Sequence, residues 1–131
     1  MDRTVLVGID LDIDGGRKLF EALKEEGLDV SAALWHYFQE SEEWRLVIAT
    51  PMVDKVGTME VYTRIQSILK KLDTVTNIHL WNISVVSPKS DLIKHLQSFI
   101  KRNPDNKSEH YLSQNTINGF YIDNAVIYSL T

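Results

Sequence analysis

The chain has 131 residues, of which 44% are hydrophobic and 24% are charged, and these values are typical of one soluble globular domain covering residues 1–131. It contains no cysteine, which excludes a disulfide framework, a thiolate metal site and a cysteine nucleophile. The formal net charge of −4 argues against broad binding to nucleic acid, because such binding depends on neutralising phosphates.

Residues 4–13, TVLVGIDLDI, place apolar and polar side chains on alternate positions, and this pattern predicts a strand. The start of the chain has no basic segment followed by a long apolar stretch, so we do not expect a signal peptide. No apolar run in the sequence approaches the roughly 20 residues that span a bilayer. We therefore expect a cytoplasmic protein without membrane contact.

The segment DLDIDGG, residues 10–16, matches the sequence pattern of an EF-hand calcium loop. The carboxylates of this pattern are Asp10, Asp12, Asp14 and Glu21. Its surroundings argue against calcium, because a strand is predicted before it where an EF-hand has a helix. Carboxylates that precede a helix accept hydrogen bonds from its free N–H groups. We therefore predict that Asp14, or Asp12, caps a helix, keep a calcium site as the alternative, and expect no cofactor.

Helix and strand patterns then alternate along the chain. Residues 17–26 have helical spacing and end at Gly27, and residues 30–38 and 43–50 are predicted to form the strands of a hairpin. Thr58 can cap the next helix. The apolar stripe of that helix consists of Val61, Tyr62, Ile65, Ile68, Leu69 and Leu72.

The second half begins with a strand predicted at residues 78–86, and a third helix follows Ser87-Pro88. A polar loop at residues 101–109 precedes two β-rich stretches. Asn118-Gly119 between these stretches is a strong hairpin signal. Asp123-Asn124 marks either a second turn or a bulge in a long last strand.

The predicted order is β-α-β-β-α-β-α-β-β, which indicates the α+β class. We expect two layers, in which a mainly antiparallel sheet carries about three helices on one face. The first six elements match a ferredoxin-like core, a split pair of βαβ units, followed by a helix and a C-terminal hairpin. This ferredoxin-like arrangement depends on the strand predicted at residues 4–13.

Candidate catalytic residues are few. None of the four histidines belongs to an H-E-x-x-H pair or a dense ligand cluster. We expect His36 and His79, which lie in predicted strands beside tryptophans, to be buried or half-buried. Asp91 and His95 stand four apart on a helix, and a surface pair is the favoured interpretation because no serine stands in a G-x-S-x-G motif. Carboxylate pairs can also form in space without a spacing rule, so an enzyme of that kind is an alternative.

Four aromatic residues, Trp35, Tyr37, Trp44 and Trp81, fall in predicted strands. An exposed aromatic sheet face can stack nucleic-acid bases, but the sequence lacks the strand motif of RNA-recognition domains. We therefore expect the aromatic residues to pack within the protein, and we expect no nucleic-acid partner. The basic residues that would support such a partner are Lys94, Lys101, Arg102 and Lys107.

The segments ALWHYF, EWRLVIATP and NGFYIDNAVIYSL resemble a family of short bacterial proteins of no known function, and the resemblance covers most of the chain. The shared motifs are hydrophobic and aromatic, so the resemblance implies common packing. It implies no activity, ligand or catalytic residue, and the aspartate run is not part of it.

Strong core and hairpin patterns, together with the missing catalytic motifs, favour a non-catalytic domain that binds a protein partner or a second copy of itself. A large exposed apolar surface or an open sheet edge would support this interpretation. A calcium-binding protein that uses residues 10–21 and an enzyme with a spatially assembled site are the alternatives.

Overall fold

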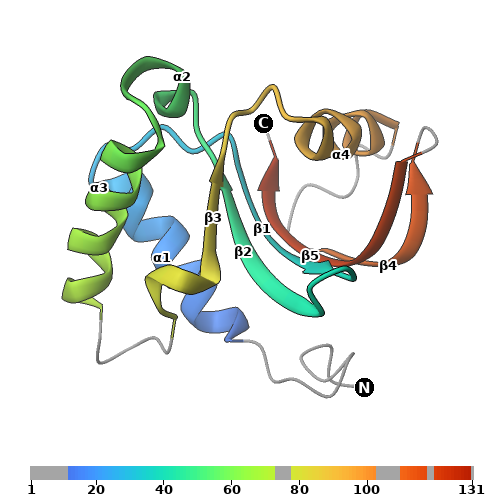
Figure 1. Ribbon diagram of the computed structural model, residues 1–131, viewed down its shortest axis with the longest axis horizontal. Coiled ribbons are helices and arrows are strands. Elements are labelled where there is room, and N and C mark those ends of the chain that lie inside the picture. Colours follow the sequence, from blue (N-terminus) through green and yellow to red (C-terminus); the bar gives the residue numbers. More distant parts are fainter. Residues whose placement is uncertain (1–11, 73–77, 103–109, 118–119, 131) are drawn as a thin grey trace.

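The computed structural model describes residues 12–72, 78–102, 110–117 and 120–130 (Figure 1). The helices are α1 (Ile13–Glu25), α2 (Met52–Val56), α3 (Thr58–Lys71), the 3-10 helix η2 (Leu80–Asn82) and α4 (Asp91–Arg102). The strands are β1 (Ala32–Phe38), β2 (Glu43–Ala49), β3 (Ile83–Val86), β4 (His110–Ile117) and β5 (Phe120–Leu130).

The described strands form one five-stranded sheet in the order β3-β2-β1-β5-β4. β1 pairs antiparallel with β2 and β5, and β4 pairs antiparallel with β5, whereas β2 and β3 are parallel. The predicted α+β class and mainly antiparallel sheet are therefore confirmed. The C-terminal hairpin is present as β4 and β5, although Asn118-Gly119 lies outside the described residues. Asp123-Asn124 lies within β5, so no turn interrupts the last strand.

Among the described residues the strand pairing does not match the expected ferredoxin-like core, because β2 and β3 are direct neighbours. Residues 4–11 of the strand predicted at residues 4–13 lie outside the described residues, and Ile13 belongs to α1. In the ferredoxin-like arrangement another strand splits each βαβ unit. Here the chain returns through α3 and η2 to a parallel strand beside β2, with Leu46 opposite Ile83. The Arg45 side chain crosses this strand pair and donates hydrogen bonds to the Ile83 carbonyl oxygen (2.9 Å) and to the Ser84 hydroxyl.

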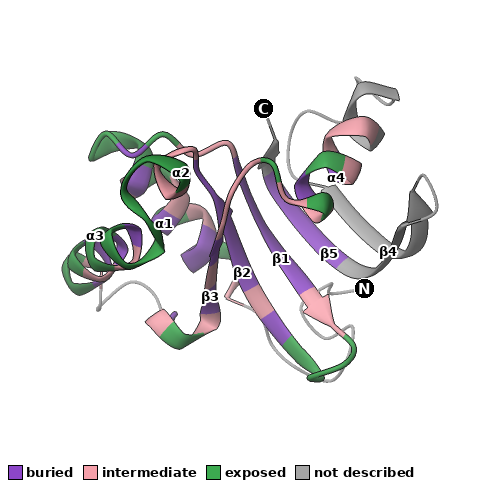
Figure 2. Ribbon diagram, turned by 45° about the horizontal axis from the view of Figure 1, so that its top comes forward, coloured by how far each residue is buried: buried purple, intermediate pink, exposed green. Residues whose placement is uncertain are grey.

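The helices cover both faces of the sheet, which corrects the prediction that they pack on one face (Figures 1 and 2). α1 and α3 pack on one face through residues such as Leu19 and Ile65. α4 packs on the opposite face through Ile93 and Leu96. Long apolar runs are typical of strands covered on both faces. In β1 and β2, side chains on both faces of the sheet are buried, and they are Ala32, Ala33, Leu34, Trp35, Leu46, Val47, Ile48 and Ala49.

α3 confirms the helix predicted from apolar spacing. Its buried side chains belong to the predicted stripe and are Val61, Ile65, Ile68 and Leu69. Thr58 is the first helical residue and not the cap, because Gly57 with φ of 87° occupies the cap position. α2 was not predicted, and the Thr50 hydroxyl supports its first turn by accepting a hydrogen bond from the Met52 N–H at 3.2 Å.

Candidate functional site

The aspartate run forms the beginning of α1. Asp12 is its N-cap, since its Oδ1 accepts a hydrogen bond from the Gly15 N–H at 2.9 Å. Asp14 lies inside the first turn, where its exposed carboxylate contacts Arg17 at 3.0 Å and Lys18 at 2.9 Å. The hydrogen bond and the positive charge of Lys18 lower the pKa of Asp14. Of the two caps considered from the sequence, Asp12 is therefore correct and Asp14 is wrong.

The structure does not bring the three described candidates of the calcium alternative into one cluster. Asp12 is directed to the helix N–H groups, Asp14 contacts two cations, and Glu21 is exposed on α1. Asp10 lies outside the described residues. In the described ranges, no three His, Asp or Glu side chains are placed together so that they could hold a metal ion. This arrangement supports the helix-start interpretation, which a calcium titration can test.

Gly16, the last residue of the run, permits close packing of α1 against the sheet. A Cβ atom there would lie 2.3 Å from the Tyr128 hydroxyl oxygen and 2.9 Å from Trp35 Nε1. The Tyr128 hydroxyl accepts a hydrogen bond from Trp35 Nε1 at 3.0 Å and donates one to the Ile13 carbonyl oxygen at 2.6 Å. The register between β1 and β5 shifts beside Tyr128, as a β-bulge does when it redirects a side chain. Gly16 thus has a structural explanation.

The histidines do not form a catalytic group in the described part of the chain. His36 is 8% exposed, and neither ring nitrogen has a hydrogen-bond partner in the structure described. Its burial lowers its pKa to about 4. His95 Nδ1 lies 2.7 Å from the Asp91 carbonyl oxygen, a contact within α4. His79 is exposed, which corrects the expectation that it is buried in a strand.

Three of the four aromatic residues noted in the sequence belong to the packed sheet. Trp35 and Trp44 are buried, and Tyr37 is half-buried with its ring centroid 5.6 Å from that of Trp44. Trp81 differs, because it lies on η2 and 70% of its surface is exposed. The prediction of internal packing is therefore confirmed for the β1 and β2 residues and wrong for Trp81.

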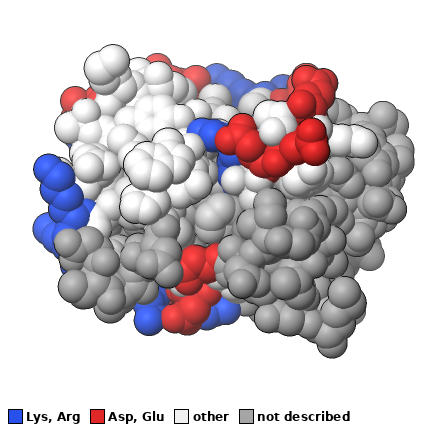
Figure 3. All heavy atoms as spheres, turned by 60° about the horizontal axis from the view of Figure 1, so that its bottom comes forward, with Lys and Arg blue, Asp and Glu red and all other residues white. Residues whose placement is uncertain are grey.

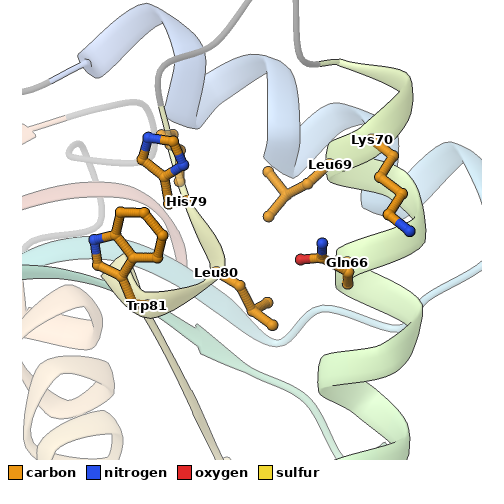
Figure 4. Close-up of a pocket in the computed structure, with 7 residues that line it drawn as sticks. Gln66, Leu69, Lys70, His79, Leu80 and Trp81 are labelled. Atoms are coloured by element: carbon orange, nitrogen blue, oxygen red, sulfur yellow. The ribbon is translucent and has the colours of Figure 1, made fainter.

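Trp81 stands at the rim of a surface groove between α3 and η2 (Figure 4). The groove has a volume of about 410 Å³. On the α3 side it is lined by Gln66, Leu69 and Lys70. On the η2 side it is lined by Ile78, His79, Leu80 and Trp81. Lys70 is the only Lys, Arg, Asp or Glu among these lining residues, so the groove offers apolar contact beside one cation.

The His79 and Trp81 rings are held in a fixed arrangement at this rim. They stack with centroids 4.2 Å apart and an interplanar angle of 6°. The Asn82 side-chain oxygen accepts a hydrogen bond from the His79 N–H at 3.0 Å, and the Asn82 N–H donates to the His79 carbonyl oxygen at 2.9 Å. These two bonds replace strand pairing at this point of the chain. The strand predicted at residues 78–86 consequently begins only at Ile83.

The outer edge of β3, beside the groove, is closed to sheet extension at its centre. The Tyr62 hydroxyl of α3 accepts a hydrogen bond from the Val85 N–H at 2.9 Å and donates one to the Ile83 carbonyl oxygen at 3.4 Å. An unpaired edge strand can otherwise add a strand from another chain. A partner at this side of the molecule would therefore contact side chains and not extend the sheet.

The basic residues that would support a nucleic-acid partner lie mostly outside the described side chains. Of the basic residues Lys94, Lys101, Arg102 and Lys107, only the exposed Lys94 has a described side chain. Within the described ranges, no helix is both long enough and apolar enough to cross a bilayer. No protein-family model, curated protein or solved structure matches this chain.

Proposed function

We propose that this chain is a non-catalytic interaction domain that binds a protein through the α3–η2 face, defined by the groove residues and the His79–Trp81 stack. One observation carries the proposal: Trp81 is 70% exposed although its ring stacks on His79 and a hydrogen bond between His79 and Asn82 closes the turn that holds it. Tryptophan is enriched among the residues that dominate binding energies at protein interfaces. A fixed ring also loses little conformational freedom when a partner covers it.

The chemistry of the groove supports binding more than catalysis. Leu69, Ile78 and Leu80 supply apolar surface, and Gln66 and Lys70 supply hydrogen-bond donors. The titratable side chains among the described lining residues are His79 and Lys70, and these lining residues include no carboxylate to orient or complement the imidazole and no serine or threonine to act as a nucleophile. This composition favours the non-catalytic alternative over an enzyme at this groove.

The energy available at Trp81 is sufficient for a specific contact. Burial of a tryptophan removes about 150–250 Å² from water. At roughly 25 cal/mol per Å², the exposed part of such a ring corresponds to about 3 kcal/mol of favourable burial. This value is typical of a residue that dominates an interface.

Site-specific photocrosslinking tests this proposal. p-Benzoylphenylalanine is placed at Gln66 inside the groove, and in a matched control at Ser67, an exposed neighbour on α3 outside it. After irradiation of the cells from which the sequence comes, we expect one discrete protein adduct from position 66 that is absent from position 67. Equal adduct patterns at both positions would contradict the proposal, provided both variants retain the wild-type melting temperature.

A further inference from the structure

We propose that the protein bound by the α3–η2 face is a second copy of this chain, arranged about a two-fold axis that passes close to Trp81. This inference rests on the proposed function of the same face. Its basis is the charge distribution around the exposed tryptophan, which is self-complementary in a two-fold contact.

Lys70 and the acidic residues of the β1–β2 turn lie on different sides of η2. Figure 3 shows an uncharged surface with Lys or Arg side chains at its left edge, a group of Asp or Glu side chains to its right, and a further Lys or Arg side chain next to that acidic group. Arg45, on the β2 side, is engaged within the chain by the Ile83 carbonyl oxygen, the Ser84 hydroxyl and Glu43. On the α3 side, exposed Lys70 lines the groove. On the β2 side lies the acidic loop, which we define as Glu40 and Glu42 in the β1–β2 turn.

The register of the sheet explains why the acidic loop is near η2. β3 runs parallel to β2 with Ile83 beside Leu46, so η2, which directly precedes β3, reaches the start of β2. The β1–β2 turn directly precedes that start. Trp81 therefore lies between Lys70 on one side and the acidic loop on the other.

These charges are available for a contact between chains. Lys70, Glu40 and Glu42 form no ion pair within the described residues, whereas nearby Lys71 contacts Glu26 at 3.3 Å. In a two-fold contact each pairing occurs twice: if one surface of the first copy meets another surface of the second copy, the same surface of the second copy meets the other surface of the first. Lys70 of each copy would consequently face the acidic loop of the other, while the two Trp81 rings meet near the axis.

The closed edge of β3 is consistent with this arrangement. Tyr62 occupies the Val85 N–H and the Ile83 carbonyl oxygen, so two copies cannot join their sheets through the centre of this strand. The contact is therefore made by side chains of α3, η2 and the acidic loop. Opposite charges at the rim set its orientation, and such contacts weaken as salt screens them.

Sedimentation velocity over a concentration series gives the first test. We expect the wild-type chain to move from monomer to dimer as concentration rises. Trp81→Ala is expected to weaken this association by at least about thirtyfold. The control is Met59→Ala, which removes another exposed apolar side chain (80% exposed) at the other end of α3 and should leave the association unchanged.

Charge exchange gives the second and sharper test. Lys70→Glu alone, and Glu40→Lys with Glu42→Lys, each place like charges across the two-fold contact and should weaken self-association by about tenfold or more. An equimolar mixture of these two variants pairs opposite charges at both symmetry-related contacts. We therefore expect the mixture to dimerise while each variant alone remains monomeric at the same concentration. Melting temperatures within a degree or two of wild type establish that the variants are folded.

The outcomes separate this inference from the proposed function. A wild-type chain that stays monomeric, a dimer insensitive to Trp81→Ala, or a charge mixture that stays monomeric would each overturn the two-fold contact. If the position-66 adduct then contains a different protein, the face binds a partner but not itself. If no adduct specific to position 66 forms either, the proposed function fails as well.

Discussion

Residues 10–16 and residues 78–82 are two short stretches that differ in their sequence motifs and in their structural roles. DLDIDGG matches a ligand-binding pattern, yet its described residues cap α1 and pack it against the sheet. IHLWN has no motif, yet it presents an exposed tryptophan on a fixed turn. The sequence motif at residues 10–16 therefore corresponds to the start of a helix. The candidate binding surface at residues 78–82, in contrast, is formed only when α3 and η2 pack together in the fold.

The largest expected effect separates two residues that line the same groove. Leu69 is 7% exposed and belongs to the main core, whereas Trp81 is mostly exposed. Leu69→Ala should lower the free energy of unfolding by about 2–5 kcal/mol because it leaves a buried cavity. Trp81→Ala should change it by no more than about 0.5 kcal/mol. Urea denaturation measures both, and a large loss for Trp81→Ala would show that this residue serves folding.

The next effect concerns the pH dependence of stability and follows from His36. Because its pKa is about 4 in the folded chain and near 6.5 when unfolded, the unfolded chain binds a proton first as the pH falls. Stability from neutral His36 is complete above about pH 6.5 and declines toward pH 4, by about 3 kcal/mol in total. Urea midpoints between pH 4 and 8 should show a shallower decline for His36→Phe. Parallel curves for the two proteins would refute this assignment.

A third effect tests the close packing at Gly16. Gly16→Ala should destabilise the protein by about 1–3 kcal/mol, because its Cβ would overlap the Tyr128 hydroxyl. Removing that hydroxyl with Tyr128→Phe should make the added methyl group less harmful. The double variant should therefore be more stable than the sum of the single effects predicts. If thermal and urea unfolding give additive stability changes for the two substitutions, the added methyl group at residue 16 does not contact the Tyr128 hydroxyl.

The smallest effects distinguish the two aspartates at the start of α1. Asp12→Ala removes the N-cap and should cost about 0.5–2 kcal/mol. Asp14→Ala removes exposed ion pairs only and should cost less stability than Asp12→Ala does. Millimolar calcium should leave the melting temperature of the wild-type chain unchanged. An increase that is lost with Asp12→Ala would restore the calcium hypothesis.

The sequence predicted those elements whose signals are repeated within one segment. The α3 stripe recurs over several turns, and the β1–β2 hairpin combines two apolar strands with a short polar turn, so both were located correctly. The order of strands and the face chosen by α4 depend on pairing between distant segments. Strand order and the position of α4 are decided by the parallel pairing of β3 with β2 and by the pairing of β5 with β1. Neither pairing is marked by a local sequence pattern.

The exposed position of Trp81 was missed for the same reason. IHLWNISVV has apolar residues enough for a strand, but Asn82 bonds to His79 and bends the first part of it into η2. Asparagine in a predicted strand was the available signal, because its side chain competes for backbone hydrogen bonds. The groove itself also needs Leu69 and Lys70 from α3, which no spacing rule links to residues 78–82.

The most direct measurement of the central claim, that the α3–η2 face serves binding and not folding, is crosslinking from Gln66 in a Trp81→Ala background. The account predicts that the position-66 adduct disappears while the melting temperature stays at the wild-type value. Asp12→Ala in the same experiment should lower the melting temperature but keep the adduct at temperatures where the chain is folded. An undiminished adduct after Trp81→Ala would contradict the account.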